Sequence, residues 1–129
     1  MKLAHTKEYN FFNLTKTGNS DRILNKIFMN TAFNLGKTFI SSGIGNAQTD
    51  LFNQFILNCL SRHSKKDFGD LEQEDIESNL DALENGGRLL SSYNIPTNIY
   101  DSNLMMNNKI WIITEAERDY TTILFPSEY

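Results

Sequence analysis

Apolar residues recur at helical spacing in the middle of this chain. Between residues 51 and 60 they follow an i, i+1, i+4, i+5 pattern, which is typical of a helix with one core-facing side. Thr49 or Asp50 can cap this helix, and we expect it to end near residues 62–63. The pattern predicts a packed helix with core positions Leu51, Phe52, Phe55, Ile56, Cys59 and Leu60.

The chain before this helix carries shorter patterns. Ser20 stands at an N-cap position, and the apolar residues that follow predict a helix over 21–28. Residues 1–19 are polar around an aromatic insert and are interpreted as an edge strand or a docked arm. Lys37–Ser41 lies between glycines and predicts a short strand. The aromatic insert consists of Tyr9, Phe11 and Phe12.

The last part of the chain has β character. Residues 88–95, 109–115 and 120–125 are rich in Leu, Ile, Tyr, Trp and Thr, which favours strands. Residues 110–113 are apolar on both faces and predict an interior strand, and the turn at 116–119 is short enough for a hairpin. The Asn-rich connection at 96–108 predicts an exposed and mobile loop.

These elements predict an α+β fold with a small, mainly antiparallel sheet of three to four strands covered by two to three helices. At 129 residues the chain is expected to form a single domain, with residues 1–28 as a possible N-terminal extension. Cys59 is the sole cysteine, which excludes an intrachain disulfide and a thiolate metal cluster.

Charge adds a constraint on partners. The net charge of −4 and the pI near 5.1 argue against direct binding to nucleic acid or to an anionic membrane. The chain has no stretch of about 18–20 apolar residues, the length that spans a bilayer. We therefore expect a soluble, cytoplasmic protein without a cofactor.

The acidic residues are unevenly distributed. Residues 67–84 contain half of the chain's 16 Asp and Glu residues, and no Lys or Arg lies between Phe68 and Gly87. Carboxylates at alternating steps of three and four residues form a line along one side of a helix, where they repel one another. The line is interpreted either as a solvated helix face or as a binding surface for a basic partner. Its members are Asp67, Asp70, Glu74, Glu77, Asp81 and Glu84.

The acidic helix has predicted ends and a predicted core-facing side. Asp70 and Gln73 have the spacing of a capping box, and Gly86 with Gly87 predicts the C-terminal stop. The narrow apolar side is expected to lie about 100° from the acidic line, since an α-helix has 3.6 residues per turn. That side consists of Ile76, Leu80 and Leu83.

Motifs for enzyme chemistry are incomplete. Gly36-Lys37-Thr38 resembles the end of a phosphate-binding loop, but Thr31 stands where the loop needs glycine. One group of His and acidic residues could hold Mn, Fe or Zn. In the alternative interpretation, a cationic His63 ends a helix, where its charge favours the negative end of the dipole, and Asp67 and Asp70 form a turn and a cap. Cys59 and Trp111 are expected in the core. The metal-site candidates are His63, Asp67, Asp70 and Glu72.

Two blocks of sequence resemble a known family. One runs from His63-Ser-Lys-Lys-Asp67-Phe-Gly-Asp70 through Asn85-Gly-Gly-Arg88 to Tyr93, and the other is Lys109-Ile-Trp-Ile-Ile-Thr through Phe-Pro126-Ser-Glu-Tyr129. They are similar to small "plasmid-related" proteins of bacterial mobile elements, sometimes labelled type I restriction subunits, with a fainter match from residue 29 to 36. The chain departs from that family at Phe68, where Trp is usual, and at 96–108, where the family's hairpin is short.

The resemblance implies a mobile-element context, in which small acidic proteins often inhibit host defence. Together with the acidic line it predicts an anti-CRISPR inhibitor, whose helix face competes with nucleic acid for the basic groove of a Cas nuclease or another defence nuclease. Met105 and Met106 of the loop are expected to add apolar contacts. The alternatives are a metal-dependent enzyme using His63, Asp67 and Asp70, or a plasmid-maintenance module that acts through protein contacts.

Overall fold

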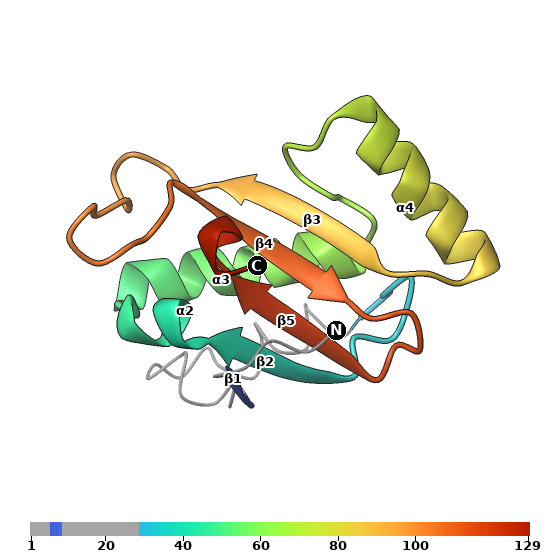
Figure 1. The fold of residues 1–129 in the computed structure, drawn as a ribbon, viewed down its shortest axis with the longest axis horizontal. Coiled ribbons are helices and arrows are strands. Elements are labelled where there is room, and N and C mark those ends of the chain that lie inside the picture. The colour runs from blue at the N-terminus through green and yellow to red at the C-terminus, as the bar shows by residue number, and fades with distance from the viewer. Residues whose placement is uncertain (1–5, 9–28) are drawn as a thin grey trace.

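A computed structural model describes residues 6–8 and 29–129 of the chain. The predicted helix at 21–28, with its Ser20 cap, and the aromatic insert at Tyr9, Phe11 and Phe12 lie outside these residues. The described residues form a mixed, mostly antiparallel five-stranded sheet with three helices, so the predicted α+β fold is confirmed (Figure 1). The sheet has one strand more than the expected maximum of four, because Thr6–Glu8, within the segment interpreted as an edge strand or docked arm, pairs with the predicted strand Lys37–Ser41 at the edge of the sheet.

The strand order is β1-β2-β5-β4-β3. β3, β4 and β5 are consecutive antiparallel strands, and the predicted β4–β5 hairpin is confirmed by the pairing of Thr114 with Thr121. β2 runs parallel to β5, with Phe39 opposite Thr122, and β1 pairs antiparallel with β2. β4 is therefore interior, as its doubly apolar sequence predicts. The strands are β1 (Thr6–Glu8), β2 (Lys37–Ser41), β3 (Leu89–Asn94), β4 (Lys109–Thr114) and β5 (Tyr120–Leu124).

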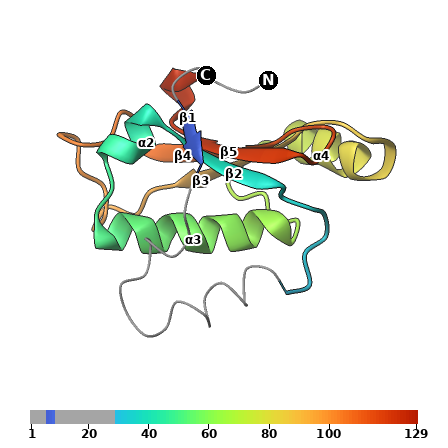
Figure 2. The ribbon, with the colours of Figure 1, turned by 90° about the horizontal axis from the view of Figure 1, so that it is seen from below.

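Two helices occupy different positions relative to the sheet. α3 lies across one face, whereas α4 lies beside the sheet, next to β3 (Figures 1 and 2). On the face opposite α3, the chain ends in a short 3-10 turn (Figure 2). The helical elements are α2 (Ser42–Asn46), α3 (Asp50–Ser64), α4 (Gln73–Asn85) and the 3-10 turn η2 (Pro126–Glu128).

α3 supplies most of the helical side of the core. Thr49 is its N-cap, and the hydroxyl of Thr49 accepts a hydrogen bond from the Phe52 amide at 3.2 Å, as predicted. Leu51 is 56% exposed, so its expected core position is wrong: it lies about 100° around the helix axis from Phe52 and faces away from the sheet. The buried α3 residues that the helical pattern did predict are Phe52, Ile56, Cys59 and Leu60.

Trp111 lies on the other face of the sheet from α3 and is only half-buried, so its expected role in the core is wrong. Its ring contacts the ring of Tyr129 edge-on, with 5.8 Å between the centroids. Alternation along β4 explains this placement, since Ile110 and Ile112 take the core side and Trp111 points the opposite way. The aromatic ring is thus covered by the chain's last residues.

Candidate protein-interaction surface

The structure divides the predicted acidic line into two parts with different roles. α4 begins at Gln73, so Asp67 and Asp70 precede the helix and do not continue its face. The carboxylates that do share one side of α4 are Glu74, Glu77, Asp81 and Glu84, and we refer to these four as the acidic line from here on. The predicted continuous line of six is therefore wrong at its N-terminal end.

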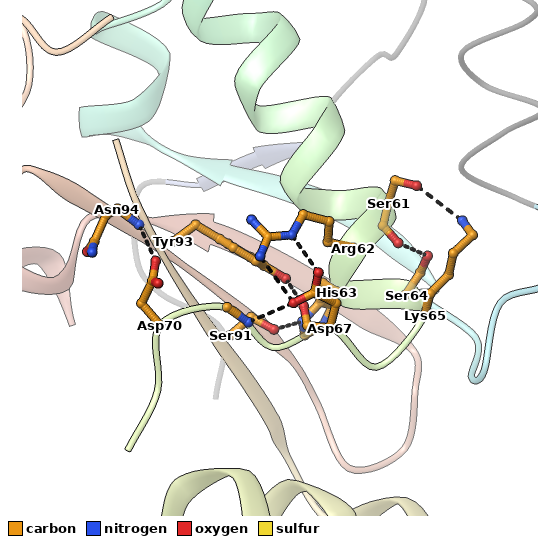
Figure 3. A network of polar contacts seen from close by, with 11 residues as sticks. Ser61, Arg62, His63, Ser64, Lys65, Asp67, Asp70, Ser91, Tyr93 and Asn94 are labelled. Atoms are coloured by element: carbon orange, nitrogen blue, oxygen red, sulfur yellow. Dashed lines mark hydrogen bonds and ion pairs between the residues drawn. The ribbon is translucent and has the colours of Figure 1, made fainter. Parts of the chain in front are cut away.

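Asp67 stabilises the turn after α3. Its carboxylate forms a bidentate pair with Arg62, at 2.7 Å from Nε to Oδ2 and 3.1 Å from Nη2 to Oδ1 (Figure 3). The Gly69 amide also donates to Oδ1 at 3.2 Å. The hydrogen bond from Arg62 holds the pKa of Asp67 below its usual range. Asp67 is thus occupied within the fold.

Asp70 covers part of the β3 edge. Its Oδ2 accepts a hydrogen bond from the Asn94 amide at 3.0 Å (Figure 3), and its own amide donates to the Ser92 carbonyl at 2.6 Å. The predicted capping box of Asp70 and Gln73 is wrong, because Glu72 is the N-cap of α4 and forms no side-chain cap bond. Residues 68–70 instead run alongside β3, with Gly69 paired to Ser92, before the helix starts at Gln73.

α4 docks on β3 through a polar residue. Asn79 and Ala82 are the buried residues of the helix, while Ile76 and Leu83 are half-buried. Leu80 is 51% exposed, which corrects its expected place on the core-facing side. The apolar spacing of residues 76, 80 and 83 does not predict which side of α4 contacts β3, because that contact is centred on an asparagine between them.

The acidic line faces away from the body of the protein. Glu77 and Asp81 are each two residues from Asn79, which places them about 200° around a helix with 3.6 residues per turn. All four carboxylates of the line are exposed. Among the described residues, the two ion pairs join Arg62 to Asp67 and Arg88 to Glu115, so no Lys or Arg there neutralises the line.

The loop at 96–108 does not extend this surface. Met105 is buried, at 4% exposure, and its sulfur accepts a hydrogen bond from the Asp101 amide at 3.4 Å. Met105 is therefore a core residue, which corrects its expected role as a surface contact. Met106 is 55% exposed, but the loop and α4 lie at opposite ends of the sheet (Figures 1 and 2).

His63 is enclosed in the core and does not join the acidic residues. Its ring nitrogens contact hydroxyl oxygens, with 2.5 Å from Nδ1 to Ser91 Oγ and 2.9 Å from Nε2 to Thr114 Oγ1. The rings of Phe33 and Phe68 pack edge-on against it. Burial, with a smaller contribution from Arg118, lowers the pKa of His63 to about 3, so it is neutral rather than the expected cation.

The metal-site alternative lacks its ligand set. Both nitrogens of His63 are used within the core, Asp67 is paired with Arg62, and Asp70 is bonded to β3. In the part of the chain that the structure describes, no three His, Cys, Asp or Glu side chains gather as a metal ion requires. Ser91 and His63 are close enough for nucleophile activation, but both are fully buried and no substrate reaches them.

Cys59 is fully buried on α3, which confirms its expected core position. Burial raises the pKa of its thiol well above the usual range, so the thiolate is not formed near neutral pH. This cysteine therefore contributes packing rather than reactivity.

The described residues contain no helix that is long and apolar enough to cross a membrane. In comparisons with known proteins, the chain matches no family model, no curated protein and no solved structure.

Proposed function

We propose that this chain is a mobile-element anti-defence protein that inhibits a Cas nuclease by placing the acidic line of α4 in the nuclease's nucleic-acid groove. The observation that carries the proposal is an exposed line of carboxylates with no cationic partner among the described residues. Like charges at these spacings weaken an isolated helix, so the line costs stability that a basic partner would recover. The resemblance to plasmid-related proteins supplies the mobile-element context.

The way α4 is held supports such a role. Asn79 fixes the side of the helix opposite the acidic line by two hydrogen bonds to β3, so the carboxylates project from an anchored element. An anchored charged surface loses less conformational freedom on binding than a loop would. A row of carboxylates on a fixed helix can occupy Lys and Arg side chains that otherwise contact phosphates.

Leu80 adds an apolar contact to this surface in place of Met105 and Met106. It lies one turn from both Glu77 and Glu84, and half of its side chain is open to solvent. Interfaces gain most of their binding energy from a few desolvated residues, while charges at the rim steer association. The proposed contact is therefore Leu80 together with the acidic line on one side of it.

The first test is survival of a targeted plasmid or phage in cells with an active CRISPR nuclease, with and without this protein. The test uses a panel of nuclease types. Protection by at least one type supports the proposal. Absence of protection against all of them contradicts it and favours a plasmid-maintenance role.

The second test separates the acidic line from general charge. The double reversal of Glu77 and Asp81 to Lys is compared with the reversal of Glu117 and Asp119, two exposed residues on the β4–β5 turn. Both variants change the net charge equally. We expect the first to abolish protection and the second to retain it, with circular dichroism showing that both are folded. Equal protection by the two variants would reject the acidic line as the binding surface.

A further inference from the structure

A chain of hydrogen bonds crosses the core from β3 to the segment before β2. After the two contacts of His63, it continues from Thr114 Oγ1 to Thr121 Oγ1 at 2.7 Å and from Thr121 Oγ1 to the Leu35 carbonyl at 2.6 Å. The four side chains of this hydrogen-bond network are fully buried, and Ser91 also interacts with the Tyr93 hydroxyl. Its members are Ser91, His63, Thr114, Thr121 and the Leu35 carbonyl.

The Leu35 carbonyl fixes the direction of every bond. A carbonyl oxygen has no proton to give, so Thr121 must donate at its 2.6 Å contact. The hydroxyl of Thr121 then has only acceptor capacity left, and Thr114 must donate to it. The proton of Thr114 is thereby used, and Thr114 must accept from Nε2 of His63. The neutral ring then has an unprotonated Nδ1, which accepts from Ser91.

We propose that this network of hydrogen bonds holds His63 in the Nε2–H tautomer and acts as a latch for residues 29–36. The tautomer is set by Thr121, a residue that does not contact the histidine. If every hydrogen bond ran in the opposite direction, the oxygens of Leu35 and Thr121 would lie 2.6 Å apart inside the core with no proton between them. Such a pair is strongly unfavourable where water cannot intervene. One peptide carbonyl thus selects the protonation pattern of a side chain on α3.

Other contacts join the same segment to α3. The Ala32 amide donates to the Ser64 carbonyl at 2.7 Å, and the ring of Phe33 lies edge-on to the ring of His63 at 5.3 Å between centroids. Leu35 itself is buried. Residues 29–36 are therefore attached both to the end of α3 and, through the hydroxyl chain, to β5.

The tautomer is tested by NMR of the ¹⁵N-labelled protein near neutral pH, through couplings between ring protons and ring nitrogens. A His5→Gln variant leaves His63 as the single histidine and removes any ambiguity of assignment. We expect one protonated nitrogen, Nε2, and one unprotonated nitrogen, Nδ1. A protonated Nδ1, or averaging between the two forms, would overturn the proposal.

Remote control of the tautomer is tested with Thr121→Val. In this variant Thr114 loses its acceptor and can turn its proton toward Nε2, so we expect the Nδ1–H form to appear. Thr122→Val is the matched control: Thr122 is an equally buried neighbour whose hydroxyl has no hydrogen-bond partner among the described residues. We expect the His63 tautomer to be unchanged in Thr122→Val. An unchanged tautomer in Thr121→Val would show that the carbonyl does not set the direction.

The latch is tested by amide hydrogen exchange on the same two variants. We expect exchange of residues 29–36 to be at least tenfold faster in Thr121→Val than in Thr122→Val, and Thr121→Ser to keep the slow exchange because it retains the hydroxyl. Equal exchange in the Thr121→Val and Thr122→Val variants would reject the latch. The wild-type NMR spectrum remains decisive for the tautomer if Thr121→Val does not fold.

Discussion

Asn79 of α4 forms with Leu90 of β3 the two hydrogen bonds that a neighbouring strand would form. Its Nδ2 donates to the Leu90 carbonyl at 2.7 Å, and its Oδ1 accepts from the Leu90 amide at 3.0 Å. Two residues further along β3, the Ser92 amide donates to the Phe68 carbonyl at 3.1 Å. With the bonds of Asp70, these contacts cover the outer edge of β3, which would otherwise be open to strand addition.

We expect Asn79→Ala to destabilise the protein by about 1–3 kcal/mol, because it leaves two backbone groups of β3 without partners. Urea denaturation measures the change. Asn85→Ala is a matched control on the same helix, since Asn85 is exposed and its side chain donates to the exposed Asp81. Its effect should stay within about 0.5 kcal/mol. Equal losses in the two variants would show that the Asn79 contact does not hold α4.

We expect stability to fall as the pH is lowered from about 6.5 toward 3, through His63. Its pKa is lowered from 6.5 to about 3 in the folded protein, so the unfolded chain binds the extra proton in this window. The contribution is therefore complete above pH 6.5 and is lost on acidification, at up to about 1.4 kcal/mol per pH unit.

This pH dependence is measured by urea denaturation between pH 5 and 6.5 in the His5→Gln variant, where His63 is the single histidine. The lower limit keeps the measurement above the range in which Asp67 titrates, since the folded-state pKa of that carboxyl is lowered by Arg62. A flat free energy of unfolding over this range would contradict neutral burial of His63.

We expect Glu128→Gln to weaken the attachment of the chain's last residues. Oε1 of Glu128 accepts from the Ser41 hydroxyl at 2.5 Å and the Phe125 amide at 2.9 Å, and Oε2 accepts from the Gly43 amide at 2.9 Å. A carboxamide must place an NH₂ group at one of these donors. The expected loss is about 1–3 kcal/mol by denaturation, whereas Glu117→Gln, at an exposed turn position, should be neutral.

We expect Cys59 to be inert to thiol reagents in the native protein and to react on unfolding. Both its burial and its raised pKa disfavour the thiolate that such reagents require. The rate of labelling at pH 8, followed with and without urea, tests this. Labelling of the native protein as fast as a free cysteine would show that α3 opens readily.

Much of the fold was predictable because local signals agree with tertiary packing. Thr49 marks the start of α3, Gly86 ends α4 with a φ of 81°, and the β-rich segments lie within one or two residues of β3, β4 and β5. These signals depend on residues close in sequence. These element boundaries can therefore be predicted without knowing which helix or strand packs against which.

The errors concern residues whose partners are distant in sequence. Asp70 is predicted to belong to a capping box, and Asn79 lies outside the predicted apolar side of the helix, because nothing nearby in sequence reveals that β3 needs hydrogen bonds at its edge. Met105 is predicted to be exposed because it lies in a polar loop, and His63 is predicted to be a helix-end cation because its hydrogen-bond partners, on β3 and β4, are far along the chain. A buried polar side chain is predictable only once its partner strand is known.

The parallel pairing of β2 with β5 also determines the order in which the sheet can form. β3, β4 and β5 pair with their neighbours in sequence, whereas Lys37 of β2 pairs with Tyr120 of β5, which is distant in sequence. Closing such a long loop costs entropy before any contact repays it, which makes non-local strand pairing slow. During synthesis, β2 has no partner on this side until β5 has left the ribosome. The three-strand meander is therefore expected to form first, and docking of β2 to limit the rate of folding.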